Sequence, residues 1–320
     1  MTRKGLIWNA AMVGALCLAL FLLYRILSHY SLEEIEASLR KLPFPYLAAA
    51  ILCAAGSYIS LTGFDYLAIL SLRKSLPYSK IALASLISLS MGHNIGFAGL
   101  SSGAFRYRYY ARWGLSMEDV AKIILFSGVT VALGLVTIGG IALLVASEDI
   151  VTLLHVDAPT LRISGGALLC VPVIYGILAK YLRGRLNLWH WSFELPQARL
   201  ALAQIAIGTV NFAFVSACLY ALFSAYAEVS YFRTVTAFVL ANTLVLTTHV
   251  PGGLGILETT LAYAVPNAAS IGALIAFRLI YYLIPLLFGG ITMMITELIF
   301  SQQSAKPEHA TQSTRDTTEA

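Results

Sequence analysis

Long apolar runs with few polar interruptions dominate the chain. The runs extend over about Leu6 to Leu27, Tyr46 to Leu70, Val120 to Val145, Ile163 to Tyr181, Ala201 to Ala225 and Ser270 to Phe300. Each approaches or exceeds the roughly 20 residues that an α-helix needs to cross the hydrocarbon core of a bilayer. The pattern predicts an all-α polytopic membrane protein with about six full spans.

Two further apolar stretches are interrupted by glycine and proline. The first runs from Ile81 to Met91 and continues into the glycine-rich residues 92–103, and the second, residues 234–267, contains Pro251-Gly252-Gly253-Leu254-Gly255. A break at membrane depth leaves backbone groups unpaired unless protein or a wet cavity supplies partners. We therefore predict two broken re-entrant hairpins, which raise the count to eight if each is taken as a transmembrane segment.

A short amphipathic segment follows the first span. Leu32, Ile35, Leu39 and Leu42 share one helical face, with acidic and basic residues elsewhere. This pattern predicts a helix over residues 31–42 that lies in the membrane interface.

Charge sets the threading through the membrane. Re-entrant hairpins keep the basic segment Arg106 to Arg112 on the cytoplasmic side and the acidic loop Glu148 to Asp157 outside, as the positive-inside tendency requires. Both termini are then cytoplasmic, and we expect the protein in the cell inner (plasma) membrane.

The element order repeats within residues 1–300. Blocks of about 1–146 and 160–300 each read as span, span, broken hairpin, span, and they start from opposite sides, as in inverted-repeat transporters. A shift of 152 positions sets Gly103 on Gly255 and Arg106 on Glu258, although few other positions match. The polar residues 301–320 are predicted to form a disordered cytoplasmic tail.

Composition agrees with a membrane protein and narrows its chemistry. The chain is 58% hydrophobic and only 12% charged, and its net charge of +5 is spread over connecting loops. That distribution indicates contact with acidic lipid head groups, not nucleic acid. The sequence has no Walker motif, dinucleotide fingerprint or zinc spacing, so we expect neither cofactor nor metal.

Glu258 and Arg278 are the strongest candidates for function. Intramembrane charges are rare and usually line a pathway, so Glu258 is interpreted as a head-group contact or proton carrier near the membrane midplane. The alternative is a structural ion pair between Glu258 and Arg278 that holds the second hairpin in place.

The first hairpin supplies the other candidates. Arg106 and Arg108 carry guanidinium forks that suit a lipid phosphate, although they are equally explained as cations that anchor the cytoplasmic end. Asp65 is expected to neutralise an arginine of this hairpin. The remaining members of the lipid-binding set are the polar turn residues and glycines of the two hairpins, His93, Asn94, Gly103, Gly253 and Gly255.

Several of these motifs resemble a known family. Gly96 through Gly103, Arg106-Tyr107-Arg108-Tyr109-Tyr110, Pro251 through Gly255 with Glu258, and the ending Arg278 to Pro285 resemble the lysylphosphatidylglycerol synthase transmembrane-domain family. In the multiple peptide resistance factors of this group, a cytosolic domain aminoacylates phosphatidylglycerol and the membrane half moves the product to the outer leaflet. Only 20 polar residues follow Phe300 here, so the resemblance implies the flippase half without the synthase.

Three function classes follow for the chain. The resemblance favours a flippase or scramblase-like transporter of a polar phospholipid, aminoacylated phosphatidylglycerol being one candidate cargo. A non-transporting lipid-binding partner of a separately encoded lipid-modifying enzyme is the main alternative. An intramembrane head-group transferase is less favoured, because no paired acid and base or nucleophile arrangement is visible.

Overall fold

The computed structural model places a defined set of residues. It describes Glu33, Glu36 and Arg40, all helical, and residues 42–95, 98–145, 148–181, 185–188, 191–194, 196–266 and 268–316. The predicted first span and most of the amphipathic segment 31–42 lie outside the described residues. So do Gly96 and Phe97 at the expected turn of the first hairpin.

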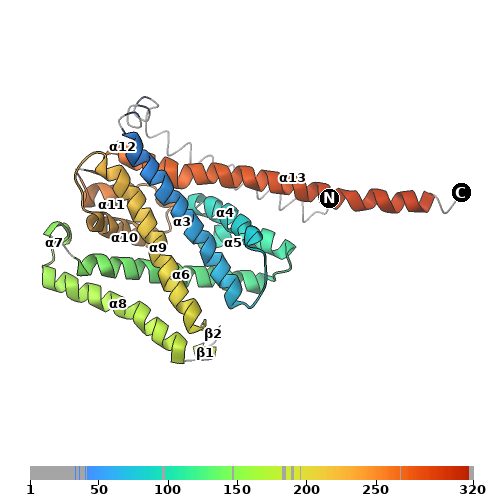
Figure 1. Ribbon diagram of the computed structural model, residues 1–320, viewed down its shortest axis with the longest axis horizontal. Coiled ribbons are helices and arrows are strands. Elements are labelled where there is room, and N and C mark those ends of the chain that lie inside the picture. The colour runs from blue at the N-terminus through green and yellow to red at the C-terminus, as the bar shows by residue number, and fades with distance from the viewer. Residues whose placement is uncertain are drawn as a thin grey trace.

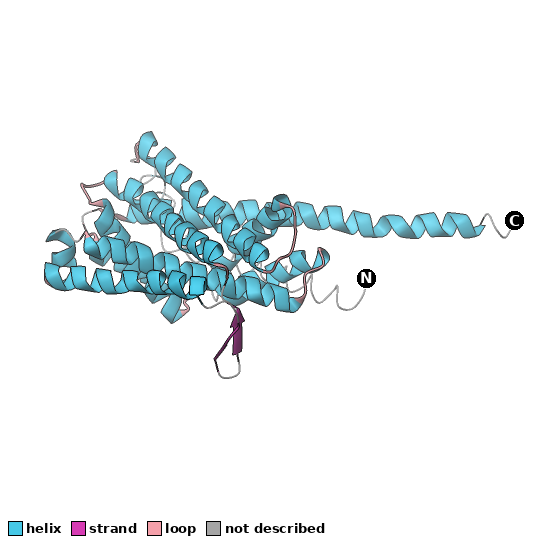
Figure 2. Ribbon diagram, turned by 60° about the horizontal axis from the view of Figure 1, so that its bottom comes forward, coloured by secondary structure: helices cyan, strands magenta, loops and turns pink. Residues whose placement is uncertain are grey.

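The described chain is a bundle of helices (Figure 1). Its elements are α3 (Phe44–Ser71), α4 (Tyr78–Ile95), α5 (Ala98–Arg112), α6 (Met117–Leu144), α7 (Glu148–Leu154), α8 (Ala158–Tyr181), β1 (Arg185–Leu188), β2 (Trp191–Glu194), α9 (Ala198–Ser224), α10 (Tyr231–Thr248), η1 (Pro251–Gly253), α11 (Ile256–Ala264), α12 (Ile271–Phe277), η2 (Arg278–Leu283) and α13 (Ile284–Asp316). The antiparallel hairpin β1–β2 is the one departure among the described residues, and it projects from the helical body (Figure 2).

Five segments within the described residues are long and apolar enough to cross a membrane. They are α3, α6, α8, α9 and the stretch Ile271–Phe300. Each coincides with a span predicted from the sequence, which confirms the prediction of an all-α polytopic membrane protein.

The two interrupted regions fold as helical hairpins. α4 packs along α5, so closely that a Cβ on Gly92 would lie 2.7 Å from Cβ of Ser102. In the second region α10 ends at His249, whose backbone is left-handed, and η1 leads into α11, which packs back on α10. Neither hairpin supplies one of the five spanning helices.

Corresponding elements recur at a nearly constant spacing. α3 and α9 begin 154 positions apart, α4 and α10 begin 153 apart, α5 and η1 begin 153 apart, and α6 and α12 begin 154 apart. The 152-position register that sets Gly103 on Gly255 is within two residues of this spacing. α3 and α9 cross antiparallel, with Gly56 against Phe214 and Gly63 against Ile207. The repeated order and the antiparallel crossing agree with two blocks of inverted direction.

One hydrogen bond marks the place where the two blocks meet. Ser57 of α3 donates to the side-chain oxygen of Asn211 of α9 at 2.7 Å, and these residues are themselves 154 positions apart. A residue that contacts its own equivalent lies near the axis that relates the blocks. Both side chains are buried.

The last span is not a uniform helix. α12 passes into the π-helix η2 at Arg278 and returns to α-helix at Ile284, directly before Pro285. α13 then continues to Asp316 (Figure 1), so the backbone of residues 301–316 is helical where the polar composition predicts disorder. The preceding span has already nucleated this helix, which continues through Pro307.

Candidate functional site

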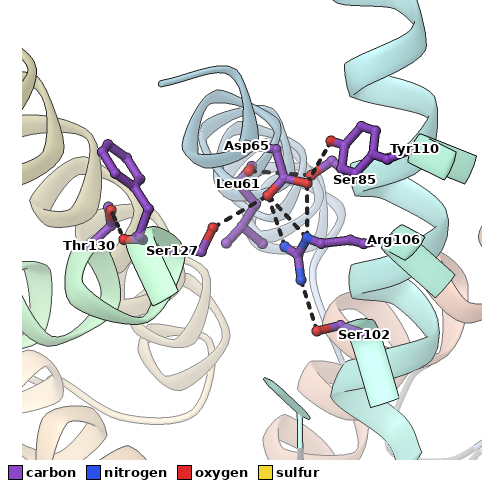
Figure 3. A network of polar contacts seen from close by, with 9 residues as sticks. Leu61, Asp65, Ser85, Ser102, Arg106, Tyr110, Ser127 and Thr130 are labelled. Carbon is purple, nitrogen blue, oxygen red and sulfur yellow. Dashed lines mark hydrogen bonds and ion pairs between the residues drawn. The ribbon is translucent and has the colours of Figure 1, made fainter. Parts of the chain in front are cut away.

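A buried ion pair joins the first hairpin to α3. Arg106 of α5 donates from Nε to both carboxylate oxygens of Asp65, at 3.2 and 3.0 Å, and from Nη2 to Oδ1 at 2.9 Å. Its Nη1 donates to Ser102 Oγ at 2.8 Å. Tyr110 and Ser127 also donate to Asp65 (Figure 3). The carboxylate therefore receives donors from α5 and α6 while it sits on α3.

This geometry bears on the two interpretations of Arg106, as a ligand for lipid phosphate and as an anchoring cation. Its side chain is 4% exposed and that of Asp65 is 0% exposed, so both charges are withdrawn from the surroundings. A buried pair of this kind persists only when its remaining hydrogen-bonding groups are satisfied, as they are for Asp65. Asp65 neutralises the hairpin arginine as expected, and Arg106 faces this carboxylate instead of an open phosphate position.

Arg278 holds the turn of the second hairpin. Its Nε donates to Glu258 Oε1 at 2.5 Å, its Nη2 donates to the Gly253 carbonyl at 3.1 Å, and its Nη1 donates to the Gly252 carbonyl. Glu258 also caps the start of α11, because its Oε2 accepts from the Gly255 amide at 2.9 Å. The Pro-Gly-Gly break thus finds its partners in one buried guanidinium, as a break at membrane depth requires.

The predicted pair between Glu258 and Arg278 is present, with unequal exposure. The Arg278 side chain is 7% exposed and the Glu258 side chain 19% exposed. The ring of Tyr282 covers the guanidinium, with Cζ 4.8 Å from the ring centre. The pair has the geometry of the structural alternative, while Glu258 keeps one partly open edge.

The π-helix is stabilised by two side chains from other elements. Pro285 has no N–H, so it cannot complete the ladder to the carbonyls four and five positions earlier. Tyr58 of α3 donates to the Tyr281 carbonyl at 3.1 Å, and Asn94 of α4 donates to the Tyr282 carbonyl at 3.3 Å. The last span is therefore tied to α3 and to the tip of the first hairpin at the place where its own ladder is incomplete.

The two hairpins meet at this same place. α4 packs on η1, and a Cβ built on Gly252 would lie 3.6 Å from the Asn94 carbonyl oxygen. His93 lies between two tyrosines, stacked on Tyr281 at 6.5 Å between ring centres and edge-on to Tyr58 at 6.2 Å. We call this region, formed by Tyr58, His93, Asn94, Gly252, Tyr281 and Tyr282, the hairpin junction.

Unmet hydrogen-bonding capacity collects on α4 beside the junction. Ser88 Oγ, Ser90 Oγ and His93 Nδ1 are buried and have no hydrogen-bond partner among the described residues. Buried polar atoms are normally paired, so an unpaired group calls for a water, an ion or a ligand. Ser90 and His93, three positions apart, lie on one side of α4, whereas Ser88, two positions before Ser90, lies on the other.

Arg108 does not join the junction. Arg108 and Arg112 each donate to both carboxylate oxygens of Glu297 on α13, with N–O distances between 2.5 and 2.9 Å. Arg112 also lies over the ring of Phe300, 4.6 Å from its centre. This double fork fastens α5 to the last span.

The three candidate glycines serve the backbone. Gly103 leaves no room for a side chain, because a Cβ there would lie 2.7 Å from the Ile124 methyl carbon. Gly253 and Gly255 have φ of +61° and +78°, a region that favours glycine because it carries no Cβ. These glycines shape the two hairpins.

Sequence reasoning missed several residues of the site. Tyr58, Tyr281, Ser57, Asn211 and Glu297 were not singled out, although they make central contacts. Two signals were available. Pro285 inside a span implies a carbonyl that needs an outside donor, and Asn211 is a polar residue in an apolar helix.

These features define a polytopic helical membrane protein in which two broken hairpins meet inside the bundle. Residues 12–289 match the model of the lysylphosphatidylglycerol synthase TM region, and the chain belongs to this family. The resemblance expected from the hairpin motifs is thereby confirmed.

Two relatives are similar over most of their length. The chain is 30% identical over 291 residues to "Uncharacterized protein slr0712" of Synechocystis sp., covering 90% of this chain and 90% of the relative. It is 28% identical over 279 residues to "Inner membrane protein YbhN" of Escherichia coli (strain K12), covering 83% and 86%. A multi-pass membrane protein with a lipid-related function agrees with both the family and the fold.

Proposed function

We propose that this protein is a lipid transporter, flippase- or scramblase-like, that moves a polar phospholipid between the leaflets of the inner membrane. The hairpin junction carries the proposal. Two broken hairpins from blocks of opposite direction meet there, and inverted-repeat transporters bind their substrates where such elements meet.

The polar interior of α4 supports a passage for head groups. Ser90 and His93 offer unpaired polar atoms on one side of α4 beside the junction, and Glu258 of the second hairpin keeps a partly exposed carboxylate. The acyl chains would stay in the surrounding lipid. Aminoacylated phosphatidylglycerol is one cargo that the family name suggests. The proposal includes cytoplasmic N- and C-termini.

The geometry assigns the ionic residues supporting roles in this transport. Asp65–Arg106 and Glu258–Arg278 hold the two hairpins in register, and the head group contacts the open edge of Glu258 and the α4 hydroxyls. Arg106 is therefore a positioning residue in this proposal, since its donors are occupied by Asp65 and Ser102.

Reconstitution tests the proposal directly. Purified protein is placed in liposomes that contain a fluorescent phosphatidylglycerol or phosphatidylethanolamine, and a reductant that cannot cross the bilayer bleaches the outer leaflet. Translocation extends bleaching to lipid that began inside. Glu258→Gln and the double variant Ser88→Ala/Ser90→Ala should slow it, whereas Glu118→Gln, in an exposed pair with Lys122, should not.

Two results would count against the proposal. Unchanged translocation in Glu258→Gln for every lipid tried removes Glu258 from the mechanism. No translocation of any lipid by folded parent protein, together with co-purified lipid or enzyme, supports the non-transporting partner instead.

A further inference from the structure

A second charged region lies away from the hairpin junction. It surrounds the end of α3, the start of α4, the α5–α6 turn and the end of the last span, and its basic residues are Arg73, Lys74, Lys80, Arg108, Arg112 and Lys122. The carboxylates there are already engaged. Asp119 pairs with Lys74 at 2.5 Å, Glu118 pairs with Lys122 at 2.8 Å, and Glu297 is shared by two arginines.

Arg73 and Lys80 remain after these pairs are formed. Both are exposed, and no carboxylate of the described residues lies within ion-pair distance of either. They flank one turn of the chain. Lys74, next to Arg73, donates to Asp119 in the first turn of α6. Lys80 Nζ lies over the Trp113 ring, 5.6 Å from its centre.

The backbone of Arg73 closes the C-terminal end of α3. Arg73 follows the C-cap residue Leu72 of α3 and has φ of 54°, the left-handed conformation that glycine usually supplies at this position. Its amide donates to the Leu70 carbonyl and that of Lys74 to the Ile69 carbonyl, which closes the helix end.

Aromatic residues place this region at the membrane surface. Tyr78 is half exposed and packs edge-on against Tyr66, and Trp113 lies under Lys80. Tyrosine and tryptophan gather at the level of lipid head groups. A ligand for Arg73 and Lys80 is therefore a component of the bilayer surface.

We propose that Arg73, Lys80 and Trp113 form a surface site for the phosphate of an anionic phospholipid. A guanidinium and an ammonium supply donors to the phosphate oxygens, and the indole contacts the upper acyl chain or glycerol. This site is independent of lipid translocation, because it shares no residue with the hairpin junction.

Tryptophan quenching tests the site. In a protein with Trp8, Trp189 and Trp191 changed to Phe, Trp113 is the remaining indole. In nanodiscs, brominated phosphatidylglycerol should quench it more than brominated phosphatidylcholine. The preference should fall about fivefold for each charge removed in Arg73→Gly and Lys80→Gln. Arg73→Gly suits the left-handed backbone, so a loss of preference there is not a loss of fold.

A matched lysine serves as the control. Lys180 also lies over an aromatic ring, 5.2 Å from the centre of Tyr181, and Lys180→Gln should keep the lipid preference. Equal quenching by the two lipids in the parent, or an unchanged preference in Arg73→Gly/Lys80→Gln, would overturn the proposal. So would inorganic phosphate that abolishes the preference, since the site would then take soluble anions. None of these outcomes depends on whether the protein moves lipid.

Discussion

The hydroxyl of Tyr58 lies 3.1 Å from the carbonyl oxygen of Tyr281 and donates to it across the bundle. Pro285, four residues after Tyr281, cannot make the corresponding helical bond. One residue of α3 therefore donates to a carbonyl whose α-helical partner position is occupied by a proline. Because Tyr281 also shares a hydrogen bond with Ser57, α3 holds both the backbone and the side chain of this tyrosine.

Removal of the Tyr58 hydroxyl should destabilise the fold. Tyr58→Phe leaves a buried carbonyl without this donor, which costs about 1–3 kcal/mol. The loss should be smaller in a Pro285→Ala background, where residue 285 regains an amide. Thermal unfolding of the four proteins in one detergent measures the coupling. Equal losses in both backgrounds would show that Pro285 is not the reason Tyr58 is needed.

Loss of one partner of the buried Asp65–Arg106 pair should destabilise the fold more than loss of both partners. Asp65→Asn leaves the buried Arg106 without its counter-charge, and loss of one partner of a buried pair typically costs about 3–5 kcal/mol. The double variant Asp65→Leu/Arg106→Met removes both charges and should recover most of the melting temperature. Glu118→Gln breaks an exposed pair and should change stability by less than about 1 kcal/mol. A double variant as unstable as Asp65→Asn would contradict this account.

The crossing of α6 and α9 depends on two glycines. A Cβ on Gly134 would lie 2.4 Å from the backbone carbon of Gly208, so Gly134→Ala should push the helices apart and cost about 1–3 kcal/mol. Gly128 in the same helix has nothing within 4 Å of a built Cβ, and Gly128→Ala should be neutral or stabilising. Melting temperatures of the two variants provide the comparison, and equal values would refute close packing at Gly134.

The glycines of the second hairpin should differ in their tolerance of a side chain. Gly253→Ala meets both an unfavourable φ and the Val245 methyl carbon at 2.7 Å, whereas Gly255→Ala meets only the unfavourable φ, at about 1–2 kcal/mol. Gly253→Ala should therefore lower stability more, and Val245→Ala should partly rescue it. If Val245→Ala does not restore stability to Gly253→Ala, the loss arises from the backbone conformation alone.

Much of the fold could be predicted from the chain because apolar length is a strong signal. The described spans begin within a few residues of the predicted ones, as for the run Tyr46 to Leu70 and helix α3. The interruption at Pro251 to Gly253 also fell where expected. The helix beyond Phe300 was missed, since polar composition suggests disorder while an existing helix can extend without a core.

The site was harder to predict, because the sequence shows which residues are charged but not all of the groups that they contact. The sequence paired Glu258 with Arg278 and Asp65 with a hairpin arginine, and both pairs exist. It could not show that the Arg106 donors are taken up by Asp65, since this depends on how the fold brings side chains of α3 and α5 together. The bond from Tyr58 to Tyr281 joins residues 223 positions apart, a distance over which periodicity carries no information.

The π-helix in the last span has no counterpart in the first block. α6, the equivalent helix, runs without interruption from Met117 to Leu144, while its partner changes from α to π at Arg278 and meets Pro285 soon after. A helix that lacks some of its backbone hydrogen bonds bends more easily than one in which they are complete. The last span can therefore bend where α6 cannot, and spin labels on either side of Arg278 would register rocking that labels along α6 would not.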